Sequence, residues 1–313
     1  MLSDLFTGKD KIFKLVCGAG NECEKDVERL TSLYSDAGAQ LFDICAKPEI
    51  LLAAKRGIEK SGKNNRYICV SVGMKGDPHI SKAVVNDSSC IKCSLCNDVC
   101  INNAVSCGVI DKVRCIGCGA CAKACPQSAI SMYETDVDLS ACLPELIKTG
   151  IDCIELHATS ELDADIWDKW GVINSCYDGM LSVCIDRLNL GNKQVLDRLR
   201  KMLKKRKPYS TIIQADGIPM SGSDDNYKTT LQAVAMAEII QNADLNCYLL
   251  ISGGTNSKTA ELAKMCNIKY NGIAIGSYAR KIVSEYIKRD DFYTADVYDK
   301  ALEIAKNLVG SVN

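Results

Sequence analysis

Short runs of aliphatic and β-branched residues alternate along most of the chain with longer stretches in which apolar residues recur every three or four positions. The short runs have no polar face, which is typical of parallel strands buried between two layers. The longer stretches have the period of an amphipathic helix. Eight strands are predicted, at Ile12–Cys17, Leu41–Cys45, Tyr67–Val72, Asp152–His157, Leu181–Asp186, Thr211–Ala215, Cys247–Ile251 and Gly272–Ile275.

The stretches between these strands supply the helices. Five of them are predicted as amphipathic helices, at Asn21–Ala37, Pro48–Ser61, Lys193–Lys205, Asn226–Ala243 and Ser257–Met265. Strands that alternate with helices indicate a parallel sheet. Eight such units favour an α/β protein closed into a (β/α)8 barrel of the TIM type over an open doubly wound sheet.

One segment interrupts this alternation. Without residues 78–135, about 255 of the 313 residues remain, which is close to the roughly 250 of a typical barrel. We therefore expect residues 1–77 to hold strands one to three and residues 136–313 to hold strands four to eight. Residues 78–135 are then inserted after strand three, at the rim where barrel enzymes carry their chemistry.

The inserted segment contains eight of the chain's 19 cysteines in two runs of the form C-x2-C-x2-C-x3-C. This spacing lets three thiolates of a run bind one [4Fe–4S] cluster while the fourth binds the other cluster. The sequence thus predicts two clusters in a segment of the bacterial ferredoxin type. The predicted ligands are Cys90, Cys93, Cys96 and Cys125 for the first cluster, and Cys115, Cys118, Cys121 and Cys100 for the second.

Zinc is the alternative metal, because C-x2-C pairs also hold structural zinc. Zinc sites close with four ligands from two such pairs and have no need of triplets, so the spacing favours iron–sulfur clusters. Cys107 lies between the two runs and is interpreted as a loop residue. The remaining cysteines lie mostly in apolar runs, where a free thiol behaves as a small hydrophobe.

Polar residues at the predicted strand ends make a candidate catalytic set. Glu155 and His157 share one face of strand four, because side chains alternate with a period of two. Lys14 lies on strand one, Asp216 ends strand six, and His79 follows strand three. A charged group inside a barrel needs a partner, so we expect a carboxylate beside Lys14. A structural ion pair is the alternative reading of the set.

Two glycine-rich loops follow strands seven and eight, where barrels often bind phosphate. Gly253, Gly254, Gly276 and Ser277 permit close approach of an anion to the backbone, and Arg280 is the candidate counter-charge. Flavin mononucleotide (FMN), a nucleotide or a phosphorylated metabolite would each supply that phosphate. Alternatively, the glycines only turn the chain from strand to helix.

Charge and composition exclude several classes of partner. The net charge is −1 and only 6% of residues are aromatic, so nucleic acid is not an expected partner. No apolar run of about 20 residues is present to span a membrane, and no secretory signal precedes the first strand. The expected location is the cytoplasm, where cysteines stay reduced.

Several blocks of sequence carry a resemblance to a known family. They are Phe13–Ala19, Asp77–His79, Gln214-Ala-Asp-Gly-Ile-Pro-Met-Ser-Gly222, Gly253-Gly-Thr-Asn256 and Gly276–Arg280. With the cysteine runs, they make the chain similar over nearly its whole length to the light-dependent period (LdpA) family of cyanobacterial iron–sulfur proteins. The resemblance implies two iron–sulfur centres, a redox-sensing role in clock input and protein partners.

Three functions remain open at this point. The first is a redox sensor or electron-transfer adaptor that acts on a redox partner or signalling protein. The second is an oxidoreductase whose clusters pass electrons to a flavin or a phosphorylated small molecule in the barrel mouth, with His157 or His79 as general acid. The third is a scaffold in which the clusters only stabilise the inserted segment.

Overall fold

The computed structural model describes residues 1–18, 20–74, 80–135, 138–159, 163–217 and 224–312. Eight parallel strands close into a barrel in the order β1-β12-β11-β10-β9-β8-β3-β2. They are β1 (Ile12–Val16), β2 (Leu41–Cys45), β3 (Tyr67–Val72), β8 (Cys153–His157), β9 (Met180–Ile185), β10 (Thr211–Asp216), β11 (Tyr248–Ser252) and β12 (Gly272–Ile275). The predicted TIM-like barrel is therefore confirmed, and the open sheet is excluded.

The inward-facing side chains change from apolar at one end of the barrel to polar at the other. At the amino end of the strands, Ile12, Leu41 and Ile212 form an apolar floor that Leu2 and Phe6 cover from outside. The next level is polar and buried, and it consists of Lys14, Asp43, Ser71, Glu155, Ser182 and Gln214. The barrel thus directs its polar interior toward the carboxyl ends of the strands.

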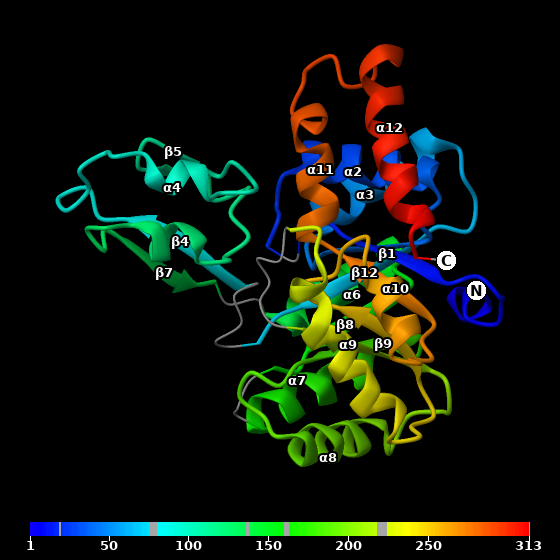
Figure 1. Ribbon diagram of the computed structural model, residues 1–313. Coiled ribbons are helices and arrows are strands. Elements are labelled where there is room, and N and C mark those ends of the chain that lie inside the picture. The colour runs from blue at the N-terminus through cyan, green and yellow to red at the C-terminus, as the bar shows by residue number, and fades with distance from the viewer. Residues whose placement is uncertain (19, 75–79, 136–137, 160–162, 218–223, 313) are drawn as a thin grey trace.

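Helices cover the outside of the barrel (Figure 1). They are α2 (Glu24–Ala37), α3 (Pro48–Ser61), α6 (Leu139–Thr149), α7 (Asp163–Cys176), α8 (Asn192–Leu203), α9 (Tyr227–Gln241), α10 (Thr259–Met265), α11 (Ser277–Ile287) and α12 (Ala295–Gly310), besides the short α1 (Leu2–Leu5) at the floor. Pro48 begins α3, where a missing N–H leaves no bond unmade. No helix in the described ranges is both long and apolar enough to cross a membrane.

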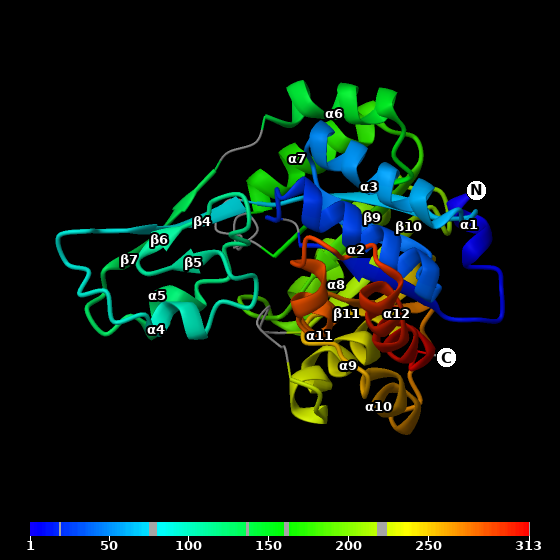
Figure 2. The same cartoon turned by 90° about the horizontal axis from the view of Figure 1, so that it is seen from above.

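Between β3 and β8 the chain leaves the barrel and forms two small antiparallel sheets. β4 (Ser81–Val85) pairs with β7 (Ile130–Glu134), and β5 (Val105–Ser106) pairs with β6 (Val109–Ile110). Two single-turn helices, α4 (Leu95–Asp98) and α5 (Ala120–Ala124), complete this cysteine-rich segment. Figures 1 and 2 show it projecting to one side of the barrel.

The cysteine-rich segment is fixed to the barrel through the loop between β1 and α2 and the start of α2. Lys82 Nζ donates to the carbonyl oxygen of Gly20 at 2.6 Å and lies 3.1 Å from the Glu22 carboxylate. The N–H of Glu22 donates to the carbonyl of Val113 at 2.8 Å. Since Lys82 is only 3% exposed, these contacts form a buried joint and hold one end of the segment against the barrel rim.

Candidate functional site

The cysteines of the two runs line two separate cavities of the segment. One cavity, the outer cysteine cavity, is lined by Cys90, Cys93, Cys96 and Cys125. The other, the inner cysteine cavity, is lined by Cys100, Cys115, Cys118 and Cys121. The last cysteine of each run thus lines the cavity of the other run, which is the grouping expected for ligands of two cubane clusters.

The donor atoms around both cavities suit iron–sulfur clusters. All eight cysteines are free of disulfide bonds, and no carboxylate or imidazole from the described residues lines either cavity. The N–H of Ala104 donates to Cys100 Sγ at 3.2 Å, and the N–H of Ala129 donates to Cys125 Sγ at 3.3 Å. Backbone donors to sulfur are the kind of contact that tunes cluster thiolates. The residues present therefore fit two clusters.

Cys107 does not line either cavity. It lies exposed in the turn between β5 and β6 with φ 46°, and its N–H donates to Asn97 Oδ1 at 3.2 Å. The neighbouring Gly108 has φ +82°, and a Cβ there would lie 3.1 Å from Cys90 Sγ. The loop interpretation of Cys107 is therefore confirmed, and Gly108 is required for the close approach of this turn to Cys90.

A third cavity, of about 70 Å³, opens at the carboxyl ends of the barrel strands. Its walls include Glu155, His157 and Asp216, three of the predicted catalytic candidates. Ile116, from the loop between Cys115 and Cys118, lines this barrel mouth and also the inner cysteine cavity. A single buried side chain, 6% exposed, is thus a shared wall of the two cavities.

Lys14 lies beneath the mouth at the centre of a buried polar network. Its Nζ is 2.6 Å from Asp43 Oδ2 and 2.6 Å from Glu155 Oε2. The sequence predicted one carboxylate partner for Lys14, and the structure provides two. Ser182 Oγ donates to Glu155 Oε2 at 2.7 Å, and Gln214 Nε2 donates to Glu155 Oε1 at 2.8 Å. Because Lys14 is fully buried and does not line the cavity, it positions Glu155 and has no access to a ligand in the mouth.

The charges of this network follow from its contacts. Burial opposes ionisation of Glu155, but Lys14 and His157 outweigh it and hold the pKa of this carboxyl well below its usual range. Burial likewise opposes the charge on Lys14, and the nearby Asp43 carboxylate restores it, so the pKa of Lys14 is raised. Glu155 therefore presents a negative charge to the mouth from a fixed position.

His157 and Cys184 face each other across neighbouring strands. They are in register between β8 and β9, and both line the mouth. His157 Nε2 lies 3.3 Å from Glu155 Oε1, and Cys184 Sγ donates to Asp216 Oδ2 at 3.1 Å. Sequence reasoning placed Cys184 among the scattered apolar thiols. Cys184 lies two positions after Ser182 on β9, so the two side chains share a face, and this spacing could have indicated that Cys184 points inward.

Gly253 and Gly254 follow β11 in the left-handed conformation, with φ +72° and +71°. A Cβ on Gly253 would collide with the side chain of Asp216 and the carbonyl of Gly217. A Cβ on Gly254 would collide with the carbonyl of Thr229. Both glycines are therefore required by the packing of the loop itself, whether or not an anion binds there.

Gly276 and Ser277 begin α11 at the mouth, and Arg280 lies one turn further along this helix. Arg280 Nη1 donates to the carbonyl oxygen of Val16 at 2.7 Å, while its buried Nε has no hydrogen-bond partner within the described residues. Burial lowers the pKa of Arg280, and the nearby Cys17 and Cys118 thiols partly offset this. Arg280 is thus a buried cation between the mouth and the inner cysteine cavity. The last candidate, His79, lies outside the described residues.

Two family models match the chain. The light dependent period A C-terminal domain matches residues 145–311, more than half of the sequence, and the 4Fe-4S binding domain matches residues 109–131. The protein "Light dependent period A" of Synechococcus elongatus is 28% identical over 293 residues, which cover 88% of this chain and 82% of that protein.

Solved structures align with the chain at much lower identity. Tryptophan synthase from M. tuberculosis, in a form bound to aminoacrylate and BRD0059, aligns with a TM-score of 0.51 at 7% identity, over 100% of this chain and 96% of that chain. The truncated 3-deoxy-D-arabino-heptulosonate 7-phosphate synthase from Thermotoga maritima aligns with a TM-score of 0.49 at 12% identity, over 96% and 86% of the two chains. The likeness to tryptophan synthase concerns the fold alone.

Proposed function

The chain belongs to the light dependent period A family, and from this premise we propose that it is a two-cluster iron–sulfur protein that carries electrons between a redox partner protein and the mouth of its barrel. Cys90, Cys93, Cys96 and Cys125 are the proposed ligands of the first cluster. Cys115, Cys118, Cys121 and Cys100 are those of the second. When bound, each cluster supplies a one-electron redox centre.

The observation that carries this proposal is the shared wall made by Ile116. The inner cysteine cavity and the barrel mouth meet at this one residue, and Arg280 is close enough to respond electrostatically to Cys118. A redox centre in the inner cavity would therefore be adjacent to whatever the mouth holds. Lys82 donates both to the carbonyl of Cys115 at 2.8 Å and to the carbonyl of Gly20 on the barrel at 2.6 Å, and so holds this cavity against the barrel.

The outer cysteine cavity is the proposed entry point for electrons. Ile91 and Leu95 line it and are 61% and 47% exposed, and Val109 nearby on β6 is 69% exposed. Exposed apolar side chains beside a redox site favour contact with another protein. A redox partner protein docking here would lie beside the first cluster and at the far end of the segment from Lys82.

The barrel mouth is the proposed site of a small anionic molecule. Its volume of about 70 Å³ is small against the roughly 300–1,000 Å³ of typical ligand pockets, which favours a compact ligand over FMN. Arg280 and the amino end of α11 supply positive potential on one wall. On the opposite side His157, held beside Glu155, is positioned to donate a proton to a reduced ligand.

A redox sensor is the second candidate, and the joint around Lys82 supports it. Lys82 contacts the carbonyl of Cys115 and also Glu22 on the barrel. A change of charge in the inner cavity would act on this lysine and so on the contacts that hold the segment against the barrel. The sensor proposal requires that a partner protein bind the oxidised and reduced forms with different affinity. Equal affinities would remove it.

The electron-transfer proposal is tested by a potentiometric titration of the anaerobic holoprotein followed by electron paramagnetic resonance. Arg280→Gln removes a positive charge from the wall, so the potential of one centre should become more negative. That centre should be the one lost in Cys118→Ser, while the centre lost in Cys93→Ser stays unchanged. An Arg280→Gln variant with full iron content and two unaltered potentials would refute the proposed contact between cluster and mouth.

A further inference from the structure

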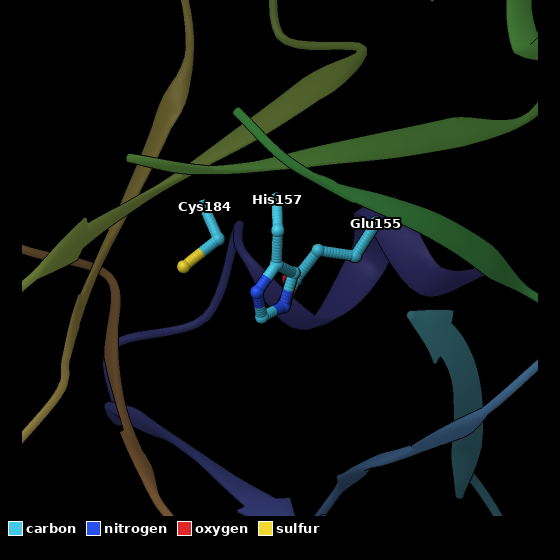
Figure 3. A group of neighbouring side chains, drawn as sticks. All are labelled: Glu155, His157 and Cys184. Carbon is cyan, nitrogen blue, oxygen red and sulfur yellow. The ribbon is translucent and has the colours of Figure 1, made fainter. Parts of the chain in front are cut away.

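Three potential metal ligands of different chemistry converge in the barrel mouth. They are a carboxylate oxygen of Glu155, an imidazole nitrogen of His157 and the sulfur of Cys184, and these atoms all lie within 4.8 Å of one another. Figure 3 shows the sulfur on one side of the imidazole ring, with the Glu155 side chain reaching the ring from the other side. From this arrangement we propose a binding site for one divalent transition-metal ion, zinc or ferrous iron, separate from the cluster cysteines.

The strand register brings the three side chains together. Glu155 and His157 alternate on β8 and so face the same side, and His157 is paired with Cys184 on β9. All three residues are buried, with exposures of 1%, 6% and 1%. Because they project from neighbouring strands of a closed barrel, their backbone positions are set before any ion binds.

The distances suit a single ion. Zinc binds nitrogen and oxygen at about 2.0–2.2 Å and thiolate at about 2.3 Å, so neighbouring ligand atoms of a tetrahedral site lie roughly 3.3–3.8 Å apart. His157 Nε2 is already 3.3 Å from Glu155 Oε1. To complete a three-ligand set, Cys184 has to approach by at most about an ångström and to lose its proton, which can pass to solvent through Asp216, its hydrogen-bond acceptor in the mouth. The fourth position then faces the cavity of the mouth, as in metal sites that bind a substrate.

The surroundings support the ligands as a metal site requires. Lys14 and Ser182 hold Oε2 of Glu155, and Gln214 Nε2 donates to Oε1, which also lies 3.3 Å from His157 Nε2. Such outer contacts orient ligating carboxylates. The mouth also carries an excess of negative charge: the carboxylates of Asp43, Glu155 and Asp216 line it, and the cations nearby among the described residues are Arg280 in the lining and Lys14 beneath it. With Cys184 bound as a thiolate the excess is two negative charges, which a divalent ion would neutralise.

A similar group lies one level lower in the barrel and provides a contrast. Asp43, Cys69 and Glu155 also bring ligand atoms within 4.8 Å of one another. There, however, the ammonium of Lys14 already occupies the centre, 2.6 Å from each carboxylate and 4.0 Å from Cys69 Sγ. Among the residues that the structure describes, no ammonium lies at the centre of the upper group, so we assign the ion to His157 and Cys184.

The test uses zinc with the anaerobic holoprotein. After incubation and desalting, zinc, iron and sulfide are counted on one sample, and the zinc X-ray absorption edge gives its ligands. We expect about one zinc per chain with one sulfur and two or more nitrogen or oxygen neighbours. Cys184→Ser and His157→Gln should each weaken zinc binding at least tenfold with iron and sulfide unchanged. Cys176→Ser, at an exposed position on α7, is the matched control and should bind zinc normally.

Two results would overturn this assignment. One is zinc binding by the wild type that is no stronger than in Cys184→Ser. The other is a zinc environment of three or four sulfurs, which would locate the ion in the cysteine cavities. The second measurement needs no variant, so the assignment is testable even if a buried substitution prevents folding. Because zinc is not redox-active, the measurement does not depend on whether the clusters transfer electrons.

Discussion

Lys82 Nζ donates to the backbone carbonyl of Gly20 at 2.6 Å and so joins the cysteine-rich segment to the barrel, and within the segment it donates to the carbonyl of Cys115 at 2.8 Å. The same ammonium lies 3.1 Å from Glu22, which in turn is 2.7 Å from Lys47. The contact is buried, and it connects the backbone of a proposed cluster ligand directly to the loop between β1 and α2. Both proposed functions depend on this contact, because it holds the cysteine-rich segment against the barrel.

Lys82→Met is expected to make the potential of the second cluster more negative. Removal of a nearby positive charge destabilises the reduced, more negative cluster. The measurement is a titration followed by paramagnetic resonance. Lys123→Met is the matched control, because Lys123 is exposed on α5 and should leave the potential unchanged. Equal shifts in both variants would indicate a general charge effect and contradict the role given to Lys82.

Lys14→Met is expected to destabilise the barrel by about 3–5 kcal/mol, because it leaves Asp43 and Glu155 buried without their cation. The free energy of unfolding is measured in denaturant. Lys60→Met is the control, since Lys60 is about half exposed and its pair with Glu28 should contribute about 1 kcal/mol or less. A similar decrease in the free energy of unfolding in the two variants would contradict the claim that Lys14 stabilises the barrel more than a surface lysine does.

Ile116→Ala is expected to accelerate loss of cluster iron in air severalfold. Ile116 is 6% exposed and separates the inner cysteine cavity from the mouth, so its truncation admits water and oxygen from that side. Iron release is followed with a chelator. Ile91→Ala, on the outer cavity, should change the rate little because Ile91 is already 61% exposed. Unchanged release in Ile116→Ala would mean that the side chain shields nothing.

Thiol alkylation should separate buried cysteines from exposed ones. Burial, with a further contribution from Glu22, raises the pKa of Cys45 to about 12. At pH 8 such a thiol is ionised to roughly one part in ten thousand, and its thiolate fraction rises about tenfold for each pH unit up to that pKa. Mass spectrometry after iodoacetamide treatment should show exposed Cys266 labelled first. Equal labelling of Cys45 in the native protein would contradict its burial.

The strand ends could be predicted from sequence because they depend on local pattern. Glu155 and His157 were assigned to one inward face by the period of two along β8, and the structure confirms it. The need for a carboxylate beside Lys14 also followed from elementary electrostatics. The identity of that carboxylate could not be predicted, because Glu155 lies 141 positions from Lys14 in the sequence and meets it only when the barrel closes.

Other features depended on contacts that no local pattern reveals. Gly253 and Gly254 were interpreted as allowing close approach of a phosphate. The structure shows that a Cβ at these positions would collide with the backbone of Gly217 and of Thr229, respectively. Cys184 was read as an apolar filler because a lone cysteine in a strand usually is. Its position beside His157 follows from the pairing of β8 with β9, which a single sequence does not specify.

Iron and sulfide content of the anaerobically purified protein and two variants tests the central claim most directly. With two clusters held crosswise by the cysteine runs, the wild type should contain about eight irons and eight sulfides. Cys93→Ser and Cys118→Ser should each lose about four of both and retain the paramagnetic signal of the other centre. About four irons or fewer in the fully loaded wild type would contradict the account.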